Sequence, residues 1–193
     1  MDNKYSTYSN PLTERYCSKD MSYIFSPQFK FSTWRKLWIA LAEGEKELGI
    51  NITDEQIEEL KAHVNDINFD DAKRIEREVR HDVMSHVQAY GLQCPKAKGI
   101  IHLGATSAYV GDNTDVIQMN EALKLIRIKL VNLINNLKQF ALKNKDIATL
   151  GFTHFQAAQL TTVGKRATLW AQDLIIDLED LNYRLENMKL RGV

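Results

Sequence analysis

The chain has 193 residues, of which 44% are apolar and 26% charged, and its 25 basic side chains balance 25 acidic ones. This length allows one or two domains with a sizeable core. A net charge of zero disfavours a protein that holds nucleic acid through a broad basic surface, whereas a local cluster suffices for a small anionic substrate. Every apolar run is shorter than the ~18 residues that a membrane-spanning helix requires.

The cysteines and histidines form no recognisable metal site. Cys17 and Cys94 do not make a C-x-x-C pair, and the sequence contains no H-E-x-x-H motif. His81 and His86 are five residues apart, which does not place both on one face of a helix. We therefore expect no metal, and two free thiols in a reducing cytosol. The polar N-terminus lacks the apolar core of a signal peptide, which agrees with a cytoplasmic protein.

The chain is predicted to begin with an arm that leads into a helix. Residues 1–29 show no clear period and contain Pro11 and Pro27, which indicates an extended arm with short turns. A helix is expected from Ser32 to about Gly49, a residue type that suits a helix end. The helical spacing comes from Trp34, Leu37, Trp38, Leu41 and Leu48.

Two further helices and a loop are expected next. Thr53 and Gln56 have the spacing of a capping box, which opens a short helix. Another helix is expected over residues 70–90 with Gly91 as its end, followed by a glycine-rich connecting loop over residues 91–111. The apolar face of the longer helix consists of Ile75, Val79, Val83 and Val87.

Two long helices with heptad-like seams are expected in the remainder. The first is capped by Asp112 or Asn113, the second begins near Thr153, and each is ~45 Å long. The seams consist of Val116, Met119, Leu123, Ile126, Leu130, Leu133, Leu137 and Phe140 in the first helix, and of Leu160, Val163, Ala167, Trp170, Leu174, Leu178, Leu181, Leu185 and Met188 in the second. Two helices alone leave apolar surface exposed, so further helices are expected to cover them.

The sequence therefore predicts an all-α chain with no strand. A small N-terminal helical domain with substrate-binding loops is expected over residues 1–111. Residues 112–193 are expected to start a long-helix bundle.

The segment 151–166, GFTHFQAAQLTTVGKR, is the most informative part of the chain. Thr153 and Gln156 again have capping-box spacing, which places His154 at the mouth of a helix. The free N–H groups and positive dipole end there suit an anionic ligand, and a histidine can hold or pass a proton beside it. Taken alone, a Thr-His pair is more often a plain polar helix start.

The whole run resembles the second sequence region of the fumarase/aspartase superfamily, and its TT-x-GKR ending resembles the adenylosuccinate lyase family. RHDVMSHV at 80–87 and GIIHLGATSAYVGDNTD at 99–115 agree in order and spacing, and the resemblance begins with PLTERYCS at 11–18. Ala157 stands where the family often has proline, and alanine also favours a helix. Family members are more than twice as long and carry a GSSxMPxKxN region that is absent here. The chain is thus expected to be the N-terminal part, with the first two long helices of the superfamily bundle.

The resemblance implies substrate contacts for three motifs and the region around His154. The family's Arg-His-Asp triplet contacts the substrate, its Thr-Ser pair holds succinyl carboxylates, and its Arg-Tyr pair contacts the nucleotide phosphate. His154 would be the general acid and His81 would orient or charge-balance the substrate, while the base would be a serine outside this chain. The binding residues implied are Arg15, Tyr16, Arg80, His81, Asp82, Thr106, Ser107, Thr153 and Gln156.

Members of the family eliminate fumarate from adenylosuccinate, giving AMP, and from succinyl-aminoimidazole-carboxamide ribotide in purine biosynthesis. A base removes the proton beside a carboxylate, the charge spreads onto that carboxylate, and an acid protonates the departing nitrogen. The resemblance implies no cofactor, because the substrate's own carboxylate is the electron sink. It also implies a cytoplasmic homotetramer whose active sites each draw on three subunits, without nucleic acid or membrane partners.

Other interpretations stay open. His81 is expected to share a helix face with Arg74, Arg77 and Ser85, which is typical of a solvated surface, and His102 is interpreted as structural. A different superfamily lyase, such as argininosuccinate lyase or a carboxymuconate cycloisomerase, has the same layout, although RHDVMSH and TTVGKR favour adenylosuccinate. A non-catalytic helical assembly module fits the periodicity equally well, but the order of the motifs argues against it.

Overall fold

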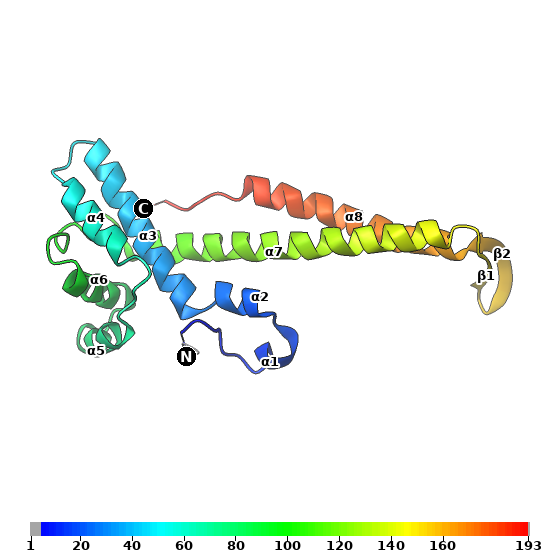
Figure 1. Cartoon of the computed structure of the whole chain (residues 1–193), viewed down its shortest axis with the longest axis horizontal. Coiled ribbons are helices and arrows are strands. Elements are labelled where there is room, and N and C mark those ends of the chain that lie inside the picture. The colour runs from blue at the N-terminus through cyan, green and yellow to red at the C-terminus, as the bar shows by residue number, and fades with distance from the viewer. Residues whose placement is uncertain (1–4, 193) are drawn as a thin grey trace. The chain divides into compact units, whose positions relative to one another are not determined.

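The structure, a computed structural model, describes residues 5–192, in which eight helices and two strands are found (Figure 1). The chain divides into two compact units, one made of residues up to 119 with the segment from 189, the other of residues 120–188. The all-α prediction is confirmed apart from one hairpin. The domain boundary expected after residue 111 stays a prediction, because packing units need not coincide with domains that fold independently. None of the described helices is long and apolar enough to cross a membrane.

The first unit has its core around a single central helix. Its helices are α1 (Thr13–Tyr16), α2 (Lys19–Ile24), α3 (Pro27–Glu47), α4 (Asp54–Ala62), α5 (Phe69–Val79), α6 (Asp82–Gln93) and the start of α7 (Ser107–Lys143). Trp34, Trp38 and Ala42 on α3 are almost fully buried, as are Leu60 of α4 and Tyr90 of α6, which belong to the same apolar cluster. Burial of two tryptophans makes α3 the element against which α4 and α6 pack, while α5 packs on α6.

A buried arginine ties α3 to the segments that follow it. The Arg35 guanidinium donates hydrogen bonds to Asp66 O at 2.9 Å, Asn68 Oδ1 at 2.9 Å and Gln93 Oε1 at 2.8 Å. It also lies 4.0 Å from the centre of the Tyr90 ring. Burial lowers its pKa to about 10, so the group is still charged at neutral pH. These bonds fix α6 and the start of α5 against α3, because a buried guanidinium needs all its donors satisfied.

The predicted extended arm over residues 1–29 is wrong in part, because it contains short helices. The Ser18 side chain accepts a hydrogen bond from Met21 N at 3.2 Å and begins α2. The Ser26 side chain accepts from Phe29 N at 3.2 Å, with Pro27 at the first position of α3. Serine before a helix and proline in its first turn are start signals that outweigh the lack of apolar periodicity here.

Of the helices expected over residues 53–90, the first is confirmed and the second is interrupted. The Thr53 capping box is complete, with Gln56 N 3.2 Å from Thr53 Oγ1 and Thr53 N 3.0 Å from Gln56 Oε1. The longer helix breaks at Arg80 and His81 into α5 and α6. Gly91 does not end it but lies inside α6.

The cap predicted for the first long helix is also wrong. α7 begins at Ser107, so Asp112 and Asn113 lie inside it. Asn113 is buried, and its side chain pairs with the backbone of Arg191, accepting from the N–H at 2.7 Å and donating to the carbonyl at 3.3 Å. The asparagine therefore holds the C-terminal segment against the first unit.

The second unit is a pair of long helices joined through a β-hairpin. It contains the rest of α7, the antiparallel strands β1 (Ala148–Thr153) and β2 (Gln156–Thr162), and α8 (Val163–Asn187). The two long helices are confirmed, but the second begins ten residues later than near Thr153. Thr162 caps it by accepting from Lys165 N at 3.1 Å. Ala157 consequently lies in β2 rather than in a helical turn.

Gly164 allows α8 to start in close contact with the end of α7. Its N–H donates to Asn144 O at 3.0 Å, and a Cβ at this position would overlap Ala141 O and lie 2.7 Å from Lys145 Cα. Such approaches are shorter than van der Waals contact, so only glycine fits without a backbone shift.

Candidate functional site

The break between α5 and α6 takes His81 off the helix surface. Arg80 ends α5 in the left-handed region, with φ 55° and ψ 37°, and His81 is extended as the N-cap of α6. The prediction that His81 shares a helical face with Arg74, Arg77 and Ser85 is therefore wrong. The apolar spacing continues in phase across the break, which is why the periodicity suggested one helix.

His81 contacts two segments of the chain through its two ring nitrogens. Nδ1 accepts a hydrogen bond from Met84 N at 3.4 Å and lies 3.5 Å from Asp82 Oδ1. Nε2 lies 3.3 Å from the hydroxyl of Ser107, 26 residues further along. When Nδ1 accepts from the backbone, the proton is on Nε2 and is donated to Ser107, whose own O–H is then free for a ligand. When His81 is protonated, Nδ1–H can pair with Asp82 instead.

The Thr-Ser pair lies where a strained loop enters α7. His102 and Gly104 both have φ 65°, and Ala105 N donates to His102 O at 3.4 Å. Thr106 is exposed and Ser107 half-buried in the first turn of the helix. Free N–H groups and the dipole of a long helix favour an anion beside these hydroxyls.

Helix α3 supports this loop from the core. The Trp38 indole N–H donates to His102 Nδ1 at 3.0 Å, and the Tyr109 hydroxyl donates to Leu37 O at 2.9 Å. Burial, and secondarily the charge of His81, lower the pKa of His102. The contact with the core agrees with the structural interpretation of His102, yet the ring is also a neighbour of His81. Sequence spacing contains no sign of the Trp38–His102 hydrogen bond, because these two residues are 64 positions apart.

The Arg-Tyr pair of the sequence motifs lies on α1. Arg15 and Tyr16 form the end of α1 and are both exposed. Tyr16 lines a cavity of about 540 Å³ together with Tyr8, Lys30 and Gln118. Within residues 5–192 no hydrogen bond or ion pair connects the pair to His81 or Ser107. Their predicted phosphate contact stays a prediction.

His154 occupies the tip of the hairpin, so its predicted place at the mouth of a helix is wrong. His154 and Phe155 have φ 49° and 61° and form the two-residue turn between β1 and β2. Thr153 and Gln156 are the strand pair that closes this turn, and all four residues are exposed. The three-residue offset of a capping box is also the offset of residues that flank a two-residue turn, which explains the error.

The hairpin is anchored to the start of α8. Arg166 donates a hydrogen bond from its guanidinium to Leu150 O at 2.8 Å. Two residues of β2 oppose one of β1 between the Leu150 and Phe152 pairs, where Gly151 lies close to Gln159 O. A bulge of this kind bends a strand and redirects the residues beyond it.

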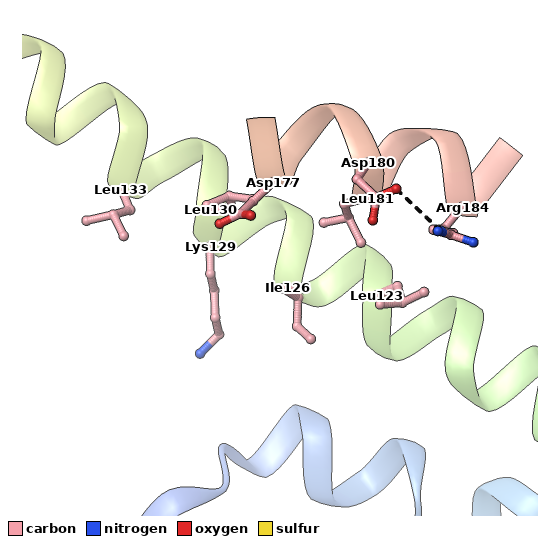
Figure 2. A pocket seen from close by; sticks show the side chains of 9 residues that line it. All are labelled: Leu123, Ile126, Lys129, Leu130, Leu133, Asp177, Asp180, Leu181 and Arg184. Carbon is pink, nitrogen blue, oxygen red and sulfur yellow. Dashed lines mark ion pairs between the residues drawn. The ribbon is translucent and has the colours of Figure 1, made fainter. Parts of the chain in front are cut away.

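An apolar groove between α7 and α8 contains none of the predicted site residues. Leu123, Ile126 and Leu130 of α7 and Leu181 of α8 line this groove, and Figure 2 shows them beside the ion pair of Asp180 and Arg184 at 3.4 Å. Its volume is about 540 Å³. This groove is the exposed apolar seam that the heptad spacing predicted. Among residues 5–192 no group of three potential metal ligands is found.

Comparison with known proteins agrees with the motifs. A family model described as lyase matches residues 20–192. Adenylosuccinate lyase of Schizosaccharomyces pombe is 54% identical over 192 residues, and that of Saccharomyces cerevisiae is 53% identical over 192 residues. Each match covers 98% of this chain and 40% of the relative, so the chain spans less than half of their length.

A solved structure gives the same fold at lower identity. The 3-carboxy-cis,cis-muconate lactonizing enzyme of Pseudomonas putida has a TM-score of 0.78 and 26% identity, over 90% of this chain and 41% of that one. Since the family model matches almost the whole sequence, the chain belongs to this lyase family.

Proposed function

We propose that the chain forms part of an adenylosuccinate lyase, which eliminates fumarate from adenylosuccinate and from succinyl-aminoimidazole-carboxamide ribotide. The observation that carries the proposal is the 3.3 Å contact between His81 Nε2 and Ser107 Oγ, which joins two separate motifs of that family. Sequence identities of 54% and 53% to two adenylosuccinate lyases, each over 98% of this chain, support the proposal. The reaction places the protein in AMP and purine biosynthesis.

The cluster around Ser107 is suited to hold the succinyl carboxylates. The N–H of Met84 donates to His81, His81 donates to Ser107, and the Ser107 hydroxyl donates onward to the substrate. Thr106 adds a second hydroxyl at the positive end of α7. Donors fixed in advance stabilise the negative charge that develops on the carboxylate during proton removal.

His81 also balances the charge of the bound substrate. Asp82 Oδ1 lies 3.5 Å from Nδ1 and can accept a hydrogen bond whenever that nitrogen carries a proton, while Arg80 provides a permanent positive charge next to it. These two neighbours give His81 a role in orienting a dianionic group rather than in abstracting a proton.

His154 is the proposed general acid, with Thr153 and Gln156 as substrate contacts beside it. An imidazole at an exposed turn is accessible to a ligand and can donate to the departing nitrogen. The base is proposed to come from a segment that this chain does not contain. No cofactor takes part in this scheme.

We also propose that the protein is a cytoplasmic homotetramer. The support is the apolar groove of Figure 2 and the exposed hairpin, where Phe155 and Leu160 are left uncovered. Apolar side chains in such numbers are typical of surfaces that other helices cover.

A second candidate is a carboxymuconate cycloisomerase, which the shared fold of the lactonizing enzyme favours. The relatives that match at more than 50% identity favour adenylosuccinate over this substrate and over argininosuccinate.

The test uses an extended version of the protein, in which the chain is continued with the remaining segment of the S. pombe relative. Fumarate release is measured with adenylosuccinate and argininosuccinate, and lactone chemistry with carboxymuconate. Release from adenylosuccinate alone is expected. Turnover of another substrate with adenylosuccinate inert would replace the proposal, and no AMP binding would favour an assembly module.

A further inference from the structure

The hydrogen bond between Trp38 and His102 determines which nitrogen of His102 is protonated. An indole N–H can only donate, so the Nδ1 atom that lies 3.0 Å from Trp38 Nε1 must accept and carry no proton. The proton of a neutral His102 is therefore on Nε2. No hydrogen bond of Nε2 is found within residues 5–192, which leaves this N–H available to a ligand.

The surroundings also keep His102 uncharged. Protonation of Nδ1 would break the bond and leave the indole N–H of Trp38 in the core without a partner, which buried donors rarely tolerate. Burial and the neighbouring charge of His81 lower the pKa of His102 in the same direction. Asp82, in contrast, lies beside His81, with its Oδ1 atom 3.5 Å from His81 Nδ1.

The backbone at His102 is strained, so the surrounding structure must hold this residue in place, and the hydrogen bond from Trp38 is one of the contacts that do so. A φ of 65° is uncommon for a residue with a side chain and persists only where surrounding structure holds it. Trp38 is 1% exposed and packs against Trp34 and Tyr90, with ring centres 6.1 Å away in each case. A rigid donor in the core therefore holds a ring in the loop that leads into Thr106 and Ser107.

We propose that Trp38 is a positioning residue that fixes His102 as the neutral Nε2–H tautomer, so that His102 offers an uncharged donor beside His81. The tautomer follows from the fold, whereas the ligand of the Nε2–H, a carboxylate or phosphate oxygen of the substrate, rests on the proposed function.

The first test is nitrogen NMR of the chain labelled at histidine, near neutral pH. His102 is expected to show the neutral Nε2–H pattern, with a coupling from Nδ1 to the indole proton of Trp38. In Trp38→Phe, which keeps an aromatic ring but loses the donor, the signals should shift toward a mixture of tautomers. A parent chain with Nδ1–H or a doubly protonated His102 would overturn the proposal.

Trp34→Phe is the matched control. Trp34 is equally buried, at 1% exposure, but its indole N–H has no hydrogen-bond partner within residues 5–192. This substitution removes the same atoms from the same core without touching His102, so its tautomer should be unchanged. Equal changes in both variants would show that core packing, and not the hydrogen bond, sets the tautomer.

The second test measures activity of the extended version. Trp38→Phe should lower kcat/KM roughly two- to tenfold beyond Trp34→Phe, the range expected for one hydrogen bond. His102→Gln, whose amide can accept from Trp38 and still donate outward, should retain most activity, whereas His102→Leu should not. Equal activity of the Gln and Leu variants would overturn the donor role. If the parent extended protein is inactive, the proposed function fails, while the NMR result still decides the tautomer. If Trp38→Phe does not fold, the parent spectrum and the Gln and Leu pair decide.

Discussion

The His81–Ser107 cluster and the hairpin tip with His154 differ in what holds them in place. The first is supported by the core, since α3 donates to His102 from Trp38 and accepts from Tyr109 through Leu37. The second consists of an exposed two-residue turn between two strands that pair with each other. The proposed binding group is therefore built on buried structure, whereas the proposed acid lies on an element that its own unit leaves accessible.

The two regions are therefore held in position in different ways. Donors aimed at a developing charge are most effective when they do not move during the reaction, which the buried contacts of the first region provide. An exposed turn instead takes its final environment from the ligand or from neighbouring protein. Four substitutions or conditions test whether the two regions respond differently.

The largest effect is expected for His154→Ala in the extended version. Loss of a general acid should lower kcat by about 10²–10⁴, and the melting temperature should stay unchanged because the side chain is exposed. Steady-state fumarate release and a thermal melt measure both. His63→Ala, which changes a histidine outside the hairpin, is the control, and a near-normal kcat for His154→Ala would remove the residue from the acid role.

Acid should destabilise the first unit through His86, a buried histidine of α6. His86 stacks on Phe31 with ring centres 3.7 Å apart, and burial, followed by the charge of Arg35, lowers its pKa to about 4. A histidine with a lowered folded pKa binds protons more readily when unfolded, so stability is complete above pH 6.5 and is lost as the pH falls toward 4. The shift corresponds to a loss of up to about 3 kcal/mol in the free energy of unfolding.

Denaturant unfolding at several pH values between these limits measures this loss. His86→Gln, which cannot be protonated, should flatten the dependence. An identical slope for His86→Gln and the parent would show that His86 is not the responsible group.

Gly164→Ala should destabilise the second region by about 1–3 kcal/mol, as expected for overpacking. The added Cβ would overlap Ala141 O at the junction of α7 and α8. Gly111→Ala is the matched control, since Gly111 lies inside α7 with open space around the point where the added methyl group would lie, and alanine there should be slightly stabilising. Calorimetry that gives equal melting temperatures for the two variants would contradict the close approach.

The smallest effect is expected at the turn itself. Phe155→Gly should raise the free energy of unfolding by about 0.5–1 kcal/mol, because glycine accepts the positive φ that costs phenylalanine energy. Phe152→Gly, in the adjoining strand of the same hairpin, should lower it instead. A fall in melting temperature for both would show that the Phe155 ring contributes contacts that outweigh the strain.

Sequence patterns predicted what depends on local order and missed what depends on distant contacts. The Thr53 capping box and the two long helices follow from spacing within a few turns, and the structure confirms them. The break at Arg80 and His81 was missed because the apolar residues keep their phase across it. The hairpin was missed because β2 does not alternate apolar and polar residues, and because Thr153 and Gln156 have the spacing of a capping box.

The site shows the same division. Motifs brought His81 and Ser107 into consideration, but their contact arises from the α5–α6 break and the entry of α7, which spacing did not reveal. Trp38 has no motif at all, and its role comes from a buried hydrogen bond across 64 residues. The roles of Arg15, Tyr16 and His154 in binding and catalysis stay predictions.

Fumarate release from adenylosuccinate decides whether this chain holds the binding groups and the acid but not the base. The chain alone and the extended version are measured side by side at equal concentration. We predict release by the extended version and none above background by the chain alone. Turnover by the chain alone would contradict the claim that an essential group lies outside it, and inactivity of both would contradict the proposed reaction.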